Sequence, residues 1–188
     1  MLSISINSSF SLVYNLYYSF ICMVVIIFTG TPGTGKTTLA KLLTNKLNFE
    51  YLDVSLFIVE NNLVEAYDPE FETNDVEVNK LVKALIKKIE NSKNLIVDSH
   101  LSHYLPKEKV DFCIVCTCDL KILKERLETR GYSEEKIKEN LEYEAFSSGL
   151  VDSFEIGHGV VHIDTSCLNI NNSILKITDF LKENKISL

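Results

Sequence analysis

A glycine-rich segment that ends in lysine and threonine is the part of this sequence with the clearest chemical meaning. The segment Gly30-Thr-Pro-Gly33-Thr-Gly35-Lys36-Thr37 matches the spacing G-x-x-x-x-G-K-T. Its glycines allow backbone N–H groups to turn inward around an anion without obstruction by Cβ atoms. A helix that begins after Gly35 would point its positive end at the same anion. The segment therefore predicts a phosphate-binding loop, or P-loop.

The ligand that this loop predicts is a nucleoside triphosphate with a magnesium ion. Lys36 can reach the β- and γ-phosphates, and Thr37 offers a hydroxyl group to Mg²⁺. A carboxylate is also needed to hold the ion, directly or through water. Asp98 ends the apolar run NLIVD and is the best candidate for this group. The alternative is that Asp98 is an ordinary surface residue at the end of a strand.

Three further side chains could act on a transferring phosphoryl group. His100 follows Asp98 by two residues and would share its side if the strand stays extended, although a structural histidine is an equal alternative. Arg126 and Arg130 are the only arginines, and their spacing of four places them on one face of a helix. Positive charge stabilises the equatorial phosphoryl oxygens during transfer. Ion pairs with neighbouring glutamates on a solvated face would also explain these arginines.

The apolar pattern predicts the elements that would position these residues. Apolar runs read as strands at 24–28, 49–54, 94–98, 112–116 and 160–164. Helical patterns lie between or after them, at 37–47, 76–89, 119–130, from 133 onward and at 174–181. This alternation predicts an α/β fold of three layers, with a five-stranded parallel sheet and helices on both faces. Ligands of such sheets bind beyond the carboxyl ends of the strands.

Length and composition support one domain and exclude several classes of protein. The chain has 188 residues, 46% of them apolar, which is enough for one well-buried core and excludes a disordered or fibrous chain. With 19 basic and 26 acidic residues, the net charge is 19 − 26 = −7. This balance argues against direct, sequence-specific binding to nucleic acid, which needs clustered Lys and Arg. A basic protein partner remains compatible with it.

The first 35 residues carry no charged side chain and need a separate interpretation. A secretory signal would have a positive n-region. A membrane span would need about 20 apolar residues. It would have to include residues 24–28, which the P-loop requires as a buried strand. We therefore expect Met23 to be the natural start, with 1–22 an extension or a weakly ordered tail and 23–188 one domain. A peripheral membrane anchor is the main alternative. We expect no stable membrane insertion and a cytoplasmic location.

Three of the five cysteines lie close together in the apolar run DFCIVCTCD. Alternation along a strand places Cys116 and Cys118 on one face and Cys113 on the other. No second pair of Cys or His follows at zinc-finger spacing. The sequence therefore predicts buried thiols in a reducing cytosol rather than a metal site.

Three segments together resemble the adenylate kinase isoenzyme six family. They are GTPGTGKTTLAKLL, IVDSHLSHYLP and LKERLETRGYSEEKIKENLEYE, and the resemblance covers roughly residues 23–183. It implies a short nucleoside-monophosphate kinase fold with a reduced lid, and the reaction ATP + AMP = 2 ADP with an accompanying ATPase activity. It also implies a part in maturing the small ribosomal subunit. The alternative is an ATPase assembly factor that binds a ribosomal protein and has little kinase activity. A kinase for another small hydroxylated substrate is a third, weaker reading.

The resemblance also implies roles for particular residues. Asp98 and His100 would form a Walker-B-like pair, and Arg130 would be the lid arginine. The monophosphate-binding region would span about 53–75 and the lid about 129–139. The ATP phosphates would be bound by Gly33, Thr34, Gly35, Lys36, Thr37 and Thr38.

The chain departs from the family pattern in ways that concern the acceptor and the partner. Thr117 stands where family members usually have arginine, and the segment 53–75 contains no arginine to hold a monophosphate. The segment 145–159 also looks unlike the usual longer helix. The partner implied by the resemblance is a basic small-subunit ribosomal protein. Acid-rich segments at 60–77 and 134–144 could meet such a partner, although a solvated helix face would carry the same charges.

Overall fold

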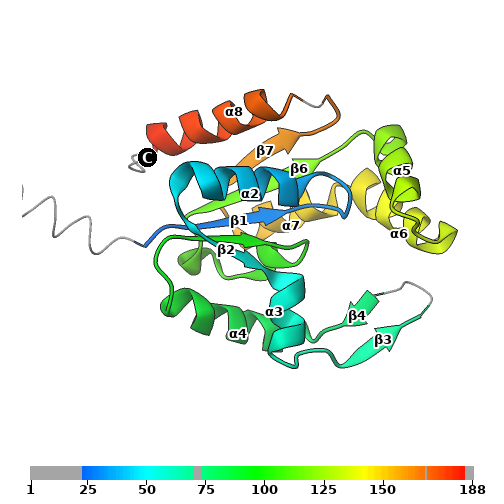
Figure 1. Cartoon of the computed structure of the whole chain (residues 1–188), viewed down its shortest axis with the longest axis horizontal. Helices are drawn as coiled ribbons and strands as arrows, with labels where there is room; N and C mark the ends of the chain where they lie inside the picture. The colour runs from blue at the N-terminus through cyan, green and yellow to red at the C-terminus, as the bar shows by residue number, and fades with distance from the viewer. Residues whose placement is uncertain (1–22, 70–72, 168, 185–188) are drawn as a thin grey trace, which may run out of the picture.

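A five-stranded parallel sheet forms the centre of the computed structural model, which describes residues 23–69, 73–167 and 169–184 (Figure 1). The strand order is β2-β5-β1-β6-β7. The strands are β1 (Val25–Thr29), β2 (Glu50–Asp53), β5 (Leu95–Asp98), β6 (Phe112–Thr117) and β7 (Val160–Asp164). All five expected strands are therefore present, and the parallel sheet is confirmed. The segment 1–22, on which the expected start at Met23 depends, lies outside the described residues.

Seven helices, two single 3₁₀ turns and one hairpin complete the described part of the chain. The helices are α2 (Lys36–Leu47), α3 (Val54–Glu60), α4 (Val78–Glu90), α5 (Leu120–Thr129), α6 (Glu134–Ala145), α7 (Ser148–Ile156) and α8 (Ile170–Glu183). The 3₁₀ turns are η1 (Ser102–Tyr104) and η2 (Lys107–Lys109), and the hairpin is β3 (Ala66–Asp68) with β4 (Thr73–Asp75).

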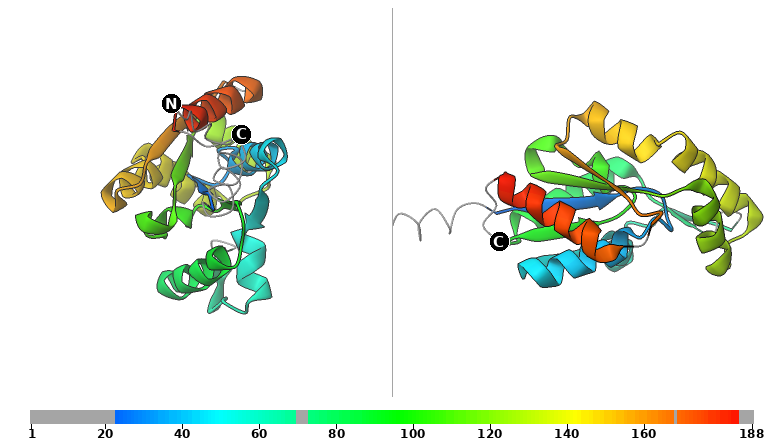
Figure 2. Two further views of the ribbon diagram at one scale, coloured as in Figure 1. Left: turned by 90° about the vertical axis from the view of Figure 1, so that its left-hand side faces the viewer. Right: turned by 90° about the horizontal axis from the view of Figure 1, so that it is seen from above.

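The sheet is covered on both faces, which confirms the three layers. Strand β1 is buried along its whole length, because side chains alternate between two covered faces. On one face Ile26 and Phe28 pack in a cluster with the apolar stripes of α2 and α8. On the other face Val25 and Ile27 pack in a cluster with α3 and α4 (Figures 1 and 2).

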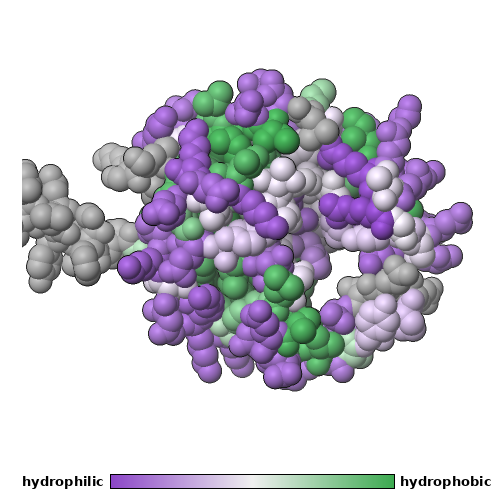
Figure 3. All heavy atoms as spheres, viewed as in Figure 1, coloured by the Kyte–Doolittle hydropathy of each residue, from purple (hydrophilic) through white to green (hydrophobic). Residues whose placement is uncertain are grey.

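Two pieces of the chain extend beyond the carboxyl ends of the strands. Helices α5 and α6 lie there, joined by a small apolar cluster of Cys118, Leu123, Leu127 and Ile137. The hairpin β3–β4 lies at the same end of the molecule (Figure 1). In the space-filling view an opening separates the surface over this hairpin from that over α5 and α6 (Figure 3). The sheet thus presents its strand ends between two projecting parts.

The predicted helix boundaries beyond β6 are confirmed in detail. The Asp119 side chain accepts hydrogen bonds from the N–H groups of Lys121 and Ile122 and so caps α5. Gly131 follows the end of α5 in the left-handed region, with φ of +74°. Ser133 caps α6 by accepting from the N–H of Lys136.

Several sequence-based expectations were incomplete or wrong. Helix α3, the hairpin and helix α7 were not predicted, because their segments are short and have no clear apolar period. Leu42 was expected on the buried face of its helix but is 41% exposed. Cys118 does not share a sheet face with Cys116, since β6 ends at Thr117 and Cys118 packs with α5 and α6 instead. No group of three metal-ligating side chains occurs among the described residues.

The helices described by the structure are all too short or too polar to cross a membrane. The longest, α8, has 14 residues and carries charged side chains on its exposed face.

Gly30 provides a test of how closely the turn after β1 approaches the sheet. A Cβ atom at this position would lie 2.1 Å from the carbonyl oxygen of Cys116, and φ is +123°. We expect Gly30→Ala to lower the unfolding free energy by about 2–4 kcal/mol, because a backbone atom cannot move aside cheaply. Gly131→Ala is the matched control, since its added Cβ meets nothing within 4 Å. Its left-handed φ alone predicts a loss of about 1 kcal/mol in urea unfolding. Equal losses in the two variants would contradict this account.

Candidate active site

The loop between β1 and α2 is a cradle of backbone held from the outside. Gly33 and Gly35 have φ of +91° and +89°, conformations that favour glycine and allow the chain to curl. A Cβ on Gly33 would also meet the side chains of Leu123 and Leu127 at about 3 Å. Thr34 closes the curl, because its hydroxyl donates to the carbonyl oxygen of Thr31 at 2.8 Å. The local sequence thus forms the predicted loop at the start of a helix.

Lys36 is the first residue of α2 and folds back over the loop. Its Nζ donates to the carbonyl oxygen of Thr31 at 3.0 Å, and the residue is buried. Burial lowers the pKa of this ammonium group, and the nearby Asp98 carboxylate opposes that shift. The loop therefore holds a buried cation whose charge is balanced by carboxylates. The adjacent Thr37 and Thr38 lie exposed in the first turn of α2.

Asp98 is the last residue of β5, next to the end of β1. It pairs in register with Phe28 of β1 and Asp53 of β2, and it is buried. The Tyr51 hydroxyl donates to its Oδ2 at 2.8 Å. Desolvation, together with this hydrogen bond, raises the pKa of Tyr51. The reading of Asp98 as an ordinary surface residue is therefore wrong.

His100 lies beyond the strand rather than on it. β5 ends at Asp98, so the chain does not stay extended and alternation along a strand does not place His100. The residue is exposed, whereas Ser99 before it is buried. Desolvation by the surrounding chain, then the positive charge of Lys36, lowers the pKa of His100 to about 4. The imidazole is neutral near pH 7.

The two arginines line one cavity but are held differently. The Arg126 guanidinium donates to the carbonyl oxygens of Thr165 at 2.8 Å and Gly33 at 3.4 Å. Arg130 follows the end of α5 and is exposed. Its positive charge contributes to lowering the pKa of Lys36. Neither arginine forms an ion pair with a carboxylate among the described residues. The alternative of glutamate partners on a solvated face is thus not observed there.

The cavity that contains these arginines has the size and lining of a nucleotide site. Its volume is about 570 Å³, within the usual range for small-molecule pockets. Gly33, Gly35 and Thr38 form its P-loop end. Leu39, Ile122 and Ile170 give it apolar walls, which suit the flat face of a base. The cavity thus has an anion-binding loop at one end and apolar walls beside it, which is the lining that a nucleoside triphosphate needs.

Two residues that sequence reasoning missed hold the cradle in place. Glu144, near the end of α6, is buried and accepts hydrogen bonds from the Thr31 hydroxyl and the Cys118 N–H. The Thr165 hydroxyl, just after β7, lies 2.6 Å from the carbonyl oxygen of Thr34. The signal for such an anchoring role is a polar side chain buried in an otherwise apolar contact region. The sequence gives no sign that Glu144 or Thr165 will be buried.

Thr117, the position where the family pattern has arginine, contacts the neighbouring strand β7 through its side chain. Its hydroxyl lies 2.7 Å from Nε2 of His162 on the neighbouring strand β7. The proposed monophosphate region contains α3 and the hairpin β3–β4. Part of that hairpin's turn, residues 70–72, lies outside the described residues.

Comparison with known proteins identifies the family. A family model described as an AAA domain matches residues 26–147. An "adenylate kinase isoenzyme 6 homolog" of Caenorhabditis elegans is 35% identical over 139 residues, covering 73% of this chain and 76% of the relative. A "putative adenylate kinase" of Pyrococcus abyssi is 39% identical over 142 residues, covering 76% and 75%. This chain belongs to the adenylate kinase isoenzyme 6 family. It is thus a P-loop enzyme of the nucleoside-monophosphate kinase class.

Solved structures support the fold at lower sequence similarity. Shikimate kinase from Acinetobacter baumannii has a TM-score of 0.64 with 16% identity, and the match covers 90% of this chain and 99% of that one. At this identity the likeness concerns the fold alone. The isoenzyme 6 family member therefore has the sheet and P-loop arrangement shared by small P-loop kinases.

Glu144 gives a direct test of how the cradle is anchored. In Glu144→Gln, one carboxylate oxygen becomes an N–H₂ group that faces a hydrogen-bond donor. We expect a loss of about 1–3 kcal/mol in unfolding free energy and weaker ATP binding, because a buried donor loses its acceptor. Glu142→Gln on the same helix is the control, since Glu142 is exposed and its ion pair with Lys138 spans 4.0 Å. Denaturant unfolding and ATP titration measure both effects, and identical behaviour of the two variants would contradict the assignment.

Proposed function

We propose that the protein transfers the γ-phosphoryl group of ATP to AMP, giving two ADP, and also hydrolyses ATP. One observation carries this proposal: Gly33, Gly35 and Thr38 of the P-loop line a nucleotide-sized cavity, and the same loop holds the buried Lys36, whose charge interacts with the strand-end Asp98. Its relatives in Pyrococcus abyssi and Caenorhabditis elegans carry the name adenylate kinase, which supports adenylate as the substrate. In the reaction an AMP phosphate oxygen attacks the γ-phosphorus, and the bond from that phosphorus to the bridging oxygen of ADP breaks.

In this proposal the P-loop binds the phosphates of ATP. The backbone N–H groups from Gly33 to Thr38 surround the anion, and the positive end of α2 adds to the attraction. Lys36 carries its charge to the β- and γ-phosphates, exchanging the Thr31 carbonyl oxygen for phosphate oxygens. The buried position of Lys36 strengthens this interaction, because little water screens it.

Thr37 and Asp98 are the residues proposed to hold Mg²⁺ with the ATP phosphates. Thr37 contributes an exposed hydroxyl at the start of α2. Asp98 contributes a buried carboxylate, one oxygen of which accepts a hydrogen bond from the Tyr51 hydroxyl. Hydroxyl, carboxylate, phosphate and water oxygens are the ligands that Mg²⁺ prefers. When bound, the ion would neutralise the charge that develops on the phosphoryl oxygens.

The remaining predicted site residues have proposed roles around the transferring group. Arg130 is exposed beside the cavity and is free to bring positive charge to the phosphoryl oxygens. Arg126 contributes to catalysis indirectly in this proposal. It donates to the Gly33 carbonyl oxygen from outside the loop and so holds the P-loop in position. His100, neutral near pH 7, orients the attacking oxygen or a water molecule. The lid would be residues 129–139, and the monophosphate region 53–75.

A second candidate is an ATPase that assists assembly of the small ribosomal subunit. It is favoured by the absence of arginine from 53–75, where the acceptor phosphate would need positive charge, and by the acidic side chains that the same region carries instead. A basic ribosomal protein would suit that charge. In this reading water replaces AMP as the acceptor, and nucleotide state controls binding of the protein partner.

Lys36 and Asp98 test the core of the proposal. We expect Lys36→Ala and Asp98→Asn each to reduce Mg²⁺-dependent turnover at least about 100-fold, because the first removes the cation proposed to bind the reacting phosphate and the second removes the carboxylate proposed to hold Mg²⁺. Thermal unfolding should show that both variants fold. Lys46→Ala, in the exposed last turn of α2, is the control and should retain normal activity. Near-normal turnover by folded Asp98→Asn would remove Asp98 from the metal site.

The acceptor decides between the two candidate functions. ADP formation is measured with ATP alone and with ATP plus each of several nucleoside monophosphates. We expect AMP to raise ADP formation at least about tenfold and to be consumed in equal amount with ATP. If AMP has no effect, the ATPase candidate replaces the kinase. A titration with a basic small-subunit ribosomal protein, with and without ATP, then tests whether nucleotide changes its affinity.

A further inference from the structure

The segment that carries His100 is fixed at both ends by buried polar groups. It begins at Asp98 in the sheet and ends in the 3₁₀ turn η1. The Ser102 hydroxyl lies 2.7 Å from the carbonyl oxygen of Phe28, and the Leu101 N–H donates to the Ser99 hydroxyl at 3.0 Å. Within this segment Ser99, Ser102 and His103 are buried, whereas His100 is exposed. His100 is therefore displayed by a tightly held loop.

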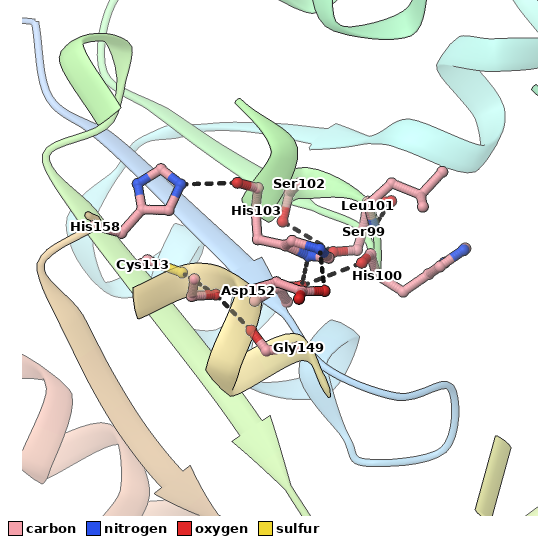
Figure 4. Close-up of polar contacts among 11 residues, drawn as sticks. Ser99, His100, Leu101, Ser102, His103, Cys113, Gly149, Asp152 and His158 are labelled. Carbon is pink, nitrogen blue, oxygen red and sulfur yellow. Dashed lines mark hydrogen bonds and ion pairs between the residues drawn. The ribbon is translucent and has the colours of Figure 1, made fainter. Parts of the chain in front are cut away.

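His103, three residues after His100, is the main anchor of this loop. Its side chain is buried, with Nδ1 at 2.8 Å from the Thr29 hydroxyl and Nε2 at 3.5 Å from Oδ2 of Asp152 on α7. Its own carbonyl oxygen lies 2.8 Å from Nε2 of His158. Figure 4 shows His103 directed toward Asp152, with His158 reaching the same turn from the other side.

The arrangement of hydrogens follows from these distances. The Asp152 carboxylate faces Nε2 and so favours a hydrogen on that nitrogen. Nδ1 is then an acceptor and takes the single hydroxyl hydrogen of Thr29, the last residue of β1. Burial lowers the pKa of His103, and Asp152 only partly opposes that shift, so the imidazole is neutral near pH 7. The neutral ring thus links α7 to the end of β1.

The link also reaches His100 itself. The Thr29 hydroxyl also lies 3.2 Å from the carbonyl oxygen of His100, but in this arrangement its one hydrogen goes to His103. His103 and His100 are three residues apart in one short loop, so the anchor and the displayed side chain share the same stretch of backbone. A shift of His103 would therefore move the backbone from which the His100 imidazole projects. Displacement of a reacting group by about 1 Å can reduce a rate about 100-fold.

We propose that Asp152 and His103 are positioning residues for His100, with Asp152 selecting the hydrogen arrangement by which His103 binds Thr29. The proposal rests on the role of His100 in the proposed function. It makes α7 part of the support of the active site, although neither Asp152 nor His103 is among the residues that line the cavity. Nε2 of His103 has no hydrogen-bond partner among the described residues, and the Asp152 carboxylate lies in the direction where one is needed.

Single variants separate the two contacts of His103. His103→Leu removes both nitrogens, whereas His103→Asn places an amide oxygen near the position of Nδ1 and can still accept from Thr29. We expect kcat to fall about 30-fold in His103→Leu, about threefold in His103→Asn and about tenfold in Asp152→Asn. KM for ATP should change less than about twofold, because the P-loop contacts are untouched. His162→Gln, an exposed histidine outside this network, is the control and should behave as the unaltered protein.

A double-mutant cycle with His100 distinguishes positioning from general support of the fold. If His103 acts through His100, His103→Leu should reduce residual turnover less than about twofold further in a His100→Ala background. Additive losses there would overturn the proposal. Asp152 is partly exposed, so Asp152→Asn tests the idea even if His103→Leu does not fold. If folded Asp152→Asn and His103→Asn have normal kcat while His100→Ala is impaired, the positioning proposal is rejected and the proposed role of His100 stands. Full activity of His100→Ala would instead reject the proposed role of His100, and positioning with it.

Discussion

The closing of a backbone loop around an anion is the constraint on which the rest of this structure depends. Inward-facing N–H groups leave the carbonyl groups and side chains of the loop facing outward, where they need partners of their own. Here the partners come from distant parts of the chain: Glu144 binds Thr31, Thr165 binds Thr34, and Arg126 binds the carbonyl oxygen of Gly33. Each attachment fixes the outside of the cradle to another part of the chain. The loop is thus held in shape by side chains from three other parts of the chain.

The same constraint gathers charge in a buried place. Lys36 loses hydration when it folds over the loop, and the Asp98 and Glu144 carboxylates nearby offset part of that cost. Each carboxylate has a further partner, Tyr51 for Asp98 and the Cys118 N–H for Glu144. Buried charges of this kind stabilise a fold only when all are satisfied together. This explains how one cation and two carboxylates share the edge of an apolar sheet.

Helices α5, α6 and α7 have a supporting role that their position beyond the sheet does not make obvious. Helix α5 supplies Arg126, α6 supplies Glu144, and α7 supplies Asp152 beside His103. The left-handed Ser147, with φ of +52°, separates α6 from α7 and turns the chain back toward the strand ends. Movement in this group of helices would therefore reach both the P-loop and the loop after β5. Such coupling suits an enzyme class whose parts close over a nucleotide.

The sequence by itself determined the sheet, the phosphate loop and the helix caps, because those depend on local patterns. Apolar runs of 4–6 residues form strands wherever both faces are covered, and the glycine spacing allows the P-loop to curl. Asp119 and Ser133 cap helices through contacts only two or three residues away. Tertiary structure alone decided that Asp98 is buried and that His100 leaves the strand. It also brought Glu144, Thr165 and Asp152 to the site, since each contacts residues more than 30 positions away and no local pattern records such a contact.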